Sequence, residues 1–365
     1  MKKSVITLAL VLVIALLTGC AGTPVVYYSD CTCPTGAHTE TTPVETTPVE
    51  TTPVETAPAV EGAVKTGIAI VASAGESKSA GDADGEAKYD VSVVAVTVDD
   101  NGVITDCIID SIGTSVLFDV NGAIVSDLTA EVPTKNELGD AYNMKLYGGA
   151  VAEWYEQAAA LASYAVGKTV EELKAGAVDE TGHAVDADLA TTATIYLGGY
   201  VAAIEKAVAN AQHLGAQAGD ELKLAIIPGV GSSASADAEN AGNAQLDVDV
   251  AAVTMNGETI TSCAIDSLQA KVAFDATGTI TADLSSYFQT KNELGEGYGM
   301  VAWGGAIAEW NQQAASFAAY ITGKTPAEVA GIDVNEGTKP TEADLATSVT
   351  IAIGGFQALI AKACN

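Results

Sequence analysis

Hydrophobic residues follow two periodicities along this chain, and the first is that of β-strands. Residues 91–98 and 103–110 are rich in β-branched side chains and flank a short turn, and their later counterparts flank Asn256-Gly257. Apolar, β-branched runs on both sides of an Asn-Gly turn predict a β-hairpin. The same pattern, found twice, predicts one hairpin in each half of the chain.

The second periodicity is helical and follows each hairpin. Apolar side chains recur at i, i+4, i+7 and i+11 in two segments: Trp154, Ala158, Leu161, Ala165 and Trp310, Ala314, Phe317, Ile321. This spacing predicts amphipathic helices. A short helix over residues 170–175 and a final helix with Val201, Ile204 and Val208 in the core are also expected. Strands followed by helices predict an α+β fold, an antiparallel sheet packed with helices.

The two patterns belong to an internal duplication. From Ile104 onward the copies align at a constant offset, as Cys107 and Cys263 show (263 − 107 = 156). A repeat of this length predicts tandem globular domains, here residues 65–215 and 216–365, because each copy is long enough to build its own core.

The N-terminus has the features of an export signal. A basic start, an apolar run over residues 5–17 and Leu17-Thr18-Gly19-Cys20 resemble a bacterial lipoprotein signal peptide over residues 1–20. This resemblance implies acylation of Cys20 and an anchor on the extracellular face of the membrane. Residues 21–64 are rich in Thr, Pro and Glu, with a repeated Thr-Thr-Pro-Val-Glu, and are expected to form an extended stalk.

Composition excludes some functions. Sixteen basic against 47 acidic residues give a net charge of −31, which disfavours nucleic-acid binding because phosphates are held by Lys and Arg. The three histidines have no counterparts between copies, so a duplicated imidazole catalysis is not expected. Cys31 and Cys33 have too few neighbouring ligands for a metal site and are expected to be a redox-active or simply exposed pair. Cys107 and Cys263 are expected to be buried thiols in preference to a disulfide between the domains.

The polar residues that recur in both copies are the candidates for function. Each copy ends with a heptapeptide, Asp-Leu-Ala-Thr-Thr-Ala-Thr or Asp-Leu-Ala-Thr-Ser-Val-Thr, followed by a Gly pair. Each also contains Thr-Lys-Asn-Glu-Leu-Gly. The candidate site residues are Asp188, Thr194, Lys135, Tyr142 and Met144 in the first copy and Asp344, Thr350, Lys291, Tyr298 and Met300 in the second.

The heptapeptide resembles the D-x-x-S-G-A-T signature of FMN-binding domains. In that family an FMN transferase esterifies the last Thr with the flavin phosphate, so the resemblance implies covalent FMN on Thr194 and Thr350, two per chain. The signature's Gly is Thr192 in one copy and Ser348 in the other. The chain as a whole is similar to the peptide-pheromone-encoding surface lipoproteins of Gram-positive bacteria, because it combines a lipoprotein signal peptide, a stalk and two such copies.

That resemblance implies flavin-based extracellular electron transfer by a carrier and not by an enzyme. The expected partners are the FMN transferase, a quinone-linked membrane donor and extracellular acceptors such as ferric iron. A phosphate on a Thr at the start of a helix would lie near unpaired N–H groups. Lys135 and Lys291 are hypothesised to stabilise the reduced flavin, or else to be solvated surface lysines. The tyrosines and methionines are candidates to stack on its ring, whereas Trp154 and Trp310 are expected in the core.

Alternatives to an electron carrier remain open at this point. The heptapeptide threonines could instead cap backbone N–H groups at the beginning of a helix. The chain could also be a solute-binding lipoprotein, with a ligand cleft between its lobes, or a structural protein of the cell surface without flavin.

Overall fold

In the computed structural model, which describes residues 62–365, each copy begins with a three-stranded antiparallel sheet. The strands are β1 (Lys65–Ser73), β2 (Gly85–Val98) and β3 (Ile104–Phe118) in the first copy, and β4 (Glu221–Gly229), β5 (Gly242–Asn256) and β6 (Thr259–Phe274) in the second. The middle strand, β2 or β5, pairs with both others. The predicted hairpins are confirmed, although their strands are longer than expected.

The middle strands are apolar throughout much of their length because both of their faces are covered. Tyr89, Val91 and Val93 of β2 belong to a core that also contains strands of the second copy, whereas Val94 and Val96 face the helices of their own copy. Side chains of a strand alternate between two faces, so a strand with two covered faces is apolar at successive positions.

Helices follow each sheet. Those of the first copy are α1 (Lys135–Leu138), the 3-10 helix η1 (Gly139–Tyr142), α2 (Met144–Gly148), α3 (Trp154–Ala165), α4 (Val170–Ala177), α5 (Ala187–Thr192) and α6 (Gly198–Ala209). Those of the second are α7 (Lys291–Leu294), η2 (Gly295–Tyr298), α8 (Met300–Gly304), α9 (Trp310–Ile321), α10 (Pro326–Ala330), α11 (Ala343–Ala346) and α12 (Gly354–Cys364). The amphipathic helices predicted from Trp154 and Trp310 are α3 and α9, so that prediction is confirmed.

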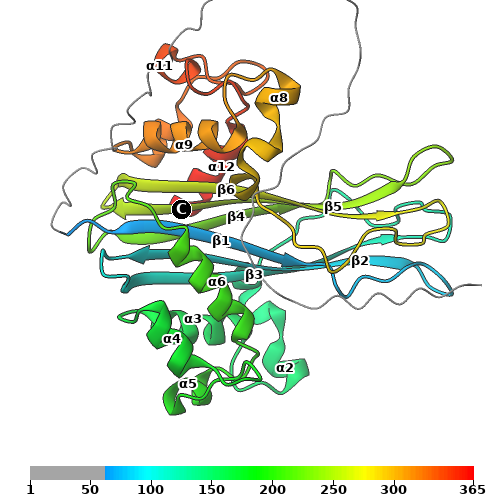
Figure 1. Cartoon of the computed structure of the whole chain (residues 1–365), viewed down its shortest axis with the longest axis horizontal. Helices are drawn as coiled ribbons and strands as arrows, with labels where there is room; N and C mark the ends of the chain where they lie inside the picture. The colour runs from blue at the N-terminus through cyan, green and yellow to red at the C-terminus, as the bar shows by residue number, and fades with distance from the viewer. Residues whose placement is uncertain (1–61) are drawn as a thin grey trace, which may run out of the picture. The chain divides into compact units, whose positions relative to one another are not determined.

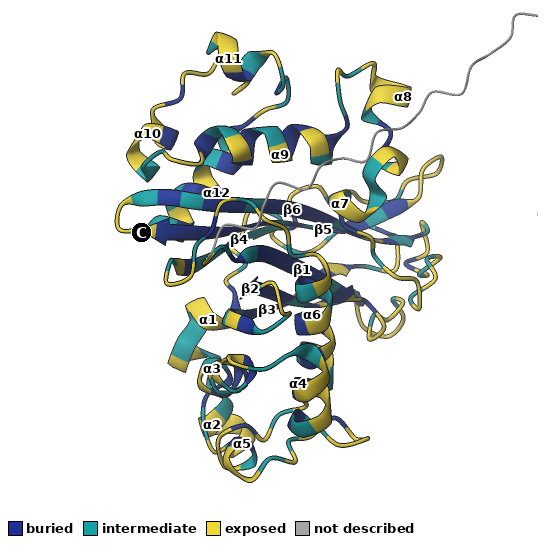
Figure 2. Ribbon diagram, turned by 60° about the vertical axis from the view of Figure 1, so that its left-hand side comes forward, coloured by how far each residue is buried: buried dark blue, intermediate teal, exposed yellow. Residues whose placement is uncertain are grey.

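The two sheets pack face to face, with the helices on the outside. Figure 1 shows the helices of the first copy below the sheets and those of the second above them. Strands of both copies supply the central core, in which the rings of Phe118 and Phe274 stack with centroids 4.0 Å apart. Figure 2 shows that buried residues concentrate in the strands and exposed residues in the outer helices. The fold class is α+β, as expected.

Contacts between the copies are reciprocal, as in a two-fold dimer. Ala80 N donates to Gly278 O at 2.8 Å, and the equivalent Ala236 N donates to Gly122 O at 2.7 Å. A lysine on the last helix of each copy also forms an ion pair with a glutamate of the other copy. Lys206 pairs with Glu293 at 2.9 Å, and its counterpart Lys362 pairs with Glu137 at 2.5 Å. One self-complementary surface, used twice, therefore joins the copies.

The predicted signal peptide, the Cys20 lipidation site and the stalk up to residue 61 lie outside the described residues. Ala63 already bridges to Gln217, and Val64 is buried. Within residues 62–365 no helix is both long and apolar enough to cross a membrane.

Candidate functional site

A lysine lies against two aromatic rings at the same place in both copies. Lys135 Nζ is 5.3 Å from the centre of the Tyr142 ring and 5.2 Å from that of Trp154. In the second copy, Lys291 Nζ is 5.3 Å from the Tyr298 ring and 4.8 Å from the Trp310 ring. These are cation–π distances, and both lysines are half-buried. Trp154 and Trp310 are buried in the core, as predicted.

A buried glutamine connects this cluster to the end of the heptapeptide. Gln157 Oε1 accepts hydrogen bonds from Thr194 N at 2.7 Å, Ile195 N at 3.1 Å and Thr194 Oγ1 at 3.3 Å. Its Nε2 donates to Ala152 O at 2.8 Å and contacts Met144 Sδ at 3.4 Å. The single side chain of Gln157 therefore holds Thr194 and Met144 near each other.

The same hydrogen bonds to the last threonine of the heptapeptide occur in the second copy. Gln313 Oε1 accepts from Thr350 N at 2.8 Å, Ile351 N at 3.2 Å and Thr350 Oγ1 at 3.2 Å, and its Nε2 donates to Ala308 O at 2.8 Å. Both glutamines are fully buried. A buried amide needs its hydrogen-bond partners, and here the last residue of the heptapeptide supplies them.

The heptapeptide forms a short helix and its exit, not the beginning of a helix. Thr191 Oγ1 donates to Asp188 O at 2.8 Å and Thr192 Oγ1 to Leu189 O at 3.0 Å, so these hydroxyls bind carbonyls and do not cap N–H groups. The capping interpretation is therefore wrong for them. Thr192 and Ser348, which replace the signature's Gly, are absent from the described non-Gly residues with positive φ. Their backbone does not require glycine.

The expected phosphate site at a helix N-terminus is also not formed by Thr194. Helix α6 begins at Gly198, four residues later, and the N–H groups of Thr194 and Ile195 already donate to Gln157. Nor does Gly198 leave open space, because a Cβ there would lie 2.7 Å from Tyr196 Oη. Any anion on Thr194 would be held by other groups.

The acids that begin the heptapeptides do not join the cluster. Asp188 and Asp344 are exposed, and no hydrogen bond or ion pair in residues 62–365 involves their carboxylates. Their backbone carbonyls accept from Thr191 and from Thr347, respectively. Of the predicted site residues, the structure brings together Lys, Tyr, Met and Thr in each copy, and leaves the Asp apart.

A buried glutamate fixes the helix that carries Met144. Glu153 accepts from Met144 N at 2.7 Å and Lys145 N at 3.2 Å, and at the N-cap of α3 its own N–H donates to Glu156 Oε2 at 2.8 Å. Glu309 does the same for Met300 N at 2.8 Å and Val301 N at 3.0 Å. A carboxylate at a helix N-terminus satisfies N–H groups that have no partner within the helix. Each glutamate thus ties α2 or α8 to the start of the long helix beside it.

A second pair of buried acids lies behind α1 and α7. Asp266 accepts from Ser267 N at 2.8 Å and Asn292 N at 3.1 Å, and Asp110 makes the equivalent bonds. Burial raises the pKa of both carboxyl groups, that of Asp266 to about 6, although hydrogen bonds from Thr290 and from these amides oppose the rise. These acids fasten the Lys-bearing segment to its sheet.

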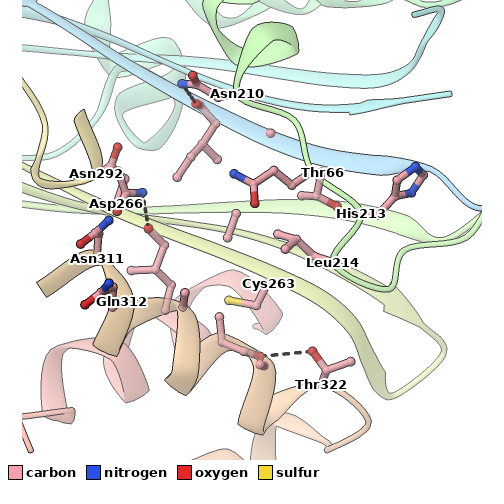
Figure 3. Close-up of a pocket in the computed structure, with 18 of the residues that line it drawn as sticks. Thr66, Asn210, His213, Leu214, Cys263, Asp266, Asn292, Asn311, Gln312 and Thr322 are labelled. Carbon is pink, nitrogen blue, oxygen red and sulfur yellow. Dashed lines mark hydrogen bonds between the residues drawn. The ribbon is translucent and has the colours of Figure 1, made fainter. Parts of the chain in front are cut away.

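A cavity of about 760 Å³ opens between the copies. Figure 3 shows Thr66, Asn210 and His213 of the first copy on one side and Asn311, Gln312 and Thr322 of the second on the other. Several of its polar groups are already used: Asn210 Nδ2 donates to Ile68 O and Asn292 Nδ2 to Ile265 O. A smaller cavity of about 380 Å³ occupies the equivalent position near Asp110 and Lys362.

Comparisons with other proteins give no family assignment: no protein-family model, curated protein or solved structure matches this chain. No cluster of His, Cys, Asp and Glu suited to a metal ion occurs in the described part of the chain. Cys107 and Cys263 are buried free thiols, as predicted, and Cys31 and Cys33 lie outside the described residues.

The glutamine and glutamate were not predicted from the sequence. The glutamine lies on the buried side of an amphipathic helix and the glutamate at its N-cap, and both recur, in Glu-Trp-Tyr-Glu-Gln and Glu-Trp-Asn-Gln-Gln. A polar residue at a core position of an amphipathic helix needs a partner. Its repetition at Gln157 and Gln313 was the signal that could have identified them.

Proposed function

We propose that this chain is a membrane-anchored extracellular flavoprotein that carries FMN esterified to Thr194 and Thr350. It passes electrons from a quinone-linked membrane donor to outside acceptors such as ferric iron. The observation that supports this is the recurrence of one cluster, in which a clamped Thr, a Lys, a Tyr and a Met surround the start of α3 and α9. The same backbone support recurs at both threonines, and an attachment point used in both copies would account for that recurrence.

The residues present fit a covalently attached FMN. Thr194 is exposed and Thr350 half-buried, so their hydroxyls are open to a modifying enzyme. Each hydroxyl makes only a long contact, 3.3 Å or 3.2 Å, with its glutamine, whereas the backbone N–H bonds are shorter. Esterification would remove the weaker contact and leave the backbone clamp in place.

FMN would supply a ring that accepts and releases electrons. The chain's own residues would orient it and adjust its environment. Gln157 fixes the attachment point, and Tyr142 and Met144 provide apolar, polarisable surface beside it. Lys135 places a positive charge next to that surface, where it favours added negative charge, and Lys291 does so in the second copy. The excess of acidic residues elsewhere suits cationic acceptors.

The test is the mass and colour of the full chain purified from its own cell envelope. The intact mass should exceed the acylated polypeptide by two FMN esters, and the protein should be yellow. Thr194→Ala and Thr350→Ala should each remove one ester, and the double variant both. Thr191→Ala is the matched control, because Thr191 lies in the same heptapeptide but bonds only a carbonyl, and it should keep both.

Two results would contradict the proposal. A native protein without added flavin mass would exclude the carrier function, and a double variant with its full flavin load would exclude these attachment points. Protein from cells without the transferase is not a suitable sample, because no enzyme would attach the flavin.

The cavity between the copies favours one other candidate, a solute-binding lipoprotein. A ligand in that cavity would be released on denaturation and would leave no covalent mass. Native mass spectrometry of the same purified chain, compared with its denatured mass, separates the two functions.

A further inference from the structure

Two aromatic side chains project into solvent next to the proposed flavin sites. Tyr147 on α2 is 85% exposed and Trp303 on α8 is 90% exposed, the largest values among the exposed large hydrophobic residues of the described chain. They occupy equivalent positions (303 − 147 = 156). Val151 and Ile307, also exposed and equivalent, follow them. The exposed Tyr196, by contrast, has Ala352 as its counterpart.

The short helix that carries each aromatic residue is held against the site. Met144 begins α2, contacts Gln157 and has its N–H bound by Glu153. Residues three apart on a helix are neighbours, so Tyr147 lies one turn beyond Met144 on the same side. Thr194 is thus linked to Tyr147 by a short series of contacts: Thr194 bonds Gln157, Gln157 contacts Met144, and Tyr147 lies one helical turn after Met144.

In the second copy the aromatic ring is folded back over the beginning of its helix. A Cβ on Gly299 would lie 2.2 Å from Trp303 Cδ1, so the indole packs directly on the Gly299 backbone. Gly299 lies between Tyr298 and Met300, both of which belong to the site cluster. Only glycine allows this close approach, and the indole is thereby held near the cluster while its outer surface stays open.

We infer that Tyr147 and Trp303 are positioning residues that cover the isoalloxazine ring of the flavin on their own copy. This inference rests on the proposed attachment at Thr194 and Thr350. A planar aromatic ligand tethered within reach is the occupant that suits an exposed planar side chain, because stacking would bury both apolar surfaces. The residues before the aromatic ring differ between the copies, since Lys145 and Leu146 correspond to Val301 and Ala302. The aromatic ring itself recurs in both copies, as the proposed attachment threonine does.

Hydroxyl-radical footprinting of the full chain tests this by measuring how fast each side chain is oxidised. Trp303 should be oxidised severalfold more slowly in FMN-loaded protein than in the same chain made without the transferase. In Thr350→Ala protein, Trp303 should be oxidised at the rate seen in the flavin-free chain, while Tyr147 stays protected. Thr194→Ala should reverse the pattern, so each variant is the control for the other.

A second measurement uses flavin fluorescence in the Thr194→Ala background, where only the Thr350 flavin remains. Trp303→Leu should raise the fluorescence, because a stacked indole quenches the ring. Trp303→Tyr should keep it quenched, and Tyr147→Leu should leave it unchanged.

Equal oxidation of Trp303 in loaded and flavin-free chains would overturn the inference. If the mass shows FMN at Thr350, the proposed function stands and only the role of Trp303 fails. If the mass shows no FMN, the proposed function itself has failed.

Discussion

Single buried polar side chains determine how the site is held. Gln157 and Gln313 each accept three bonds from two consecutive residues, and Glu153 and Glu309 each bind two N–H groups of α2 or α8. A buried polar group is costly when unpaired and specifies one arrangement when paired. The position of the threonine is therefore set by side chains far away in the sequence.

Asp266 should make the stability of the chain depend on pH. Its pKa is about 6 when folded, against about 3.9 for an unfolded Asp, so the folded state binds more protons between pH 4 and 6. Stability from this group is therefore lost as pH rises through that window, by roughly 2–3 kcal/mol. Asp266→Asn should gain stability over wild type by about this amount more at pH 7 than at pH 4, in urea unfolding.

A constant difference between Asp266→Asn and wild type from pH 4 to pH 7 would show that the Asp266 carboxyl group titrates in the folded protein as it does in the unfolded chain.

At the scale of elements, much of the fold follows from local patterns. The hairpins and the helices α3 and α9 were predictable because the periodicity of their apolar residues can be recognised within a single continuous segment of the sequence. β1 was not predicted: it is a short apolar run that becomes a strand only by pairing with β2, whose residues lie further along the chain. The approach of α1, α2 and α5 to α3 depends on tertiary packing, so only recurrence in two copies indicated which residues would meet.

The capping of α2 by Glu153 gives a prediction at this scale. Glu153→Ala should lower the free energy of unfolding by about 2–3 kcal/mol, because it removes a buried carboxylate and leaves the N–H groups of Met144 and Lys145 in α2 without partners. Thr169→Ala, which uncaps α4 alone, should cost about 1 kcal/mol. Denaturant unfolding measures both. A loss no larger than that of Thr169→Ala would show that the buried Glu153 carboxylate contributes no more than an ordinary exposed cap.

At the scale of the whole molecule, the two copies depend on each other. The sequence predicted two domains because each copy is long enough for a core, yet the central core takes residues from both. Positions such as Tyr89 and Val248 look like ordinary buried strand residues, and nothing in their pattern reveals that the opposite wall belongs to the other copy. The reciprocal packing could therefore not be read from periodicity.

Separate copies should consequently associate. Residues 62–215 alone expose one face of a sheet, including Ile70 and Val93, and should form dimers through the surface that normally meets the second copy. Light scattering after gel filtration measures this, and mixing with residues 216–365 should yield a one-to-one complex. Stable, soluble monomers of either piece would contradict the shared core.

The placement of the clusters on opposite outer layers has a consequence under the proposed function, in which the chain is attached to a membrane at one end. Face-to-face sheets lie about 10 Å apart, and each cluster lies on the outer side of its own sheet. The two clusters would therefore meet acceptors on opposite sides of the molecule and would not exchange electrons with each other. If the chain is anchored and carries flavin as proposed, its rotation about the anchor would leave one flavin facing the surrounding solution in any orientation. With two flavin sites, electron transfer to an acceptor would not depend on the orientation of the molecule.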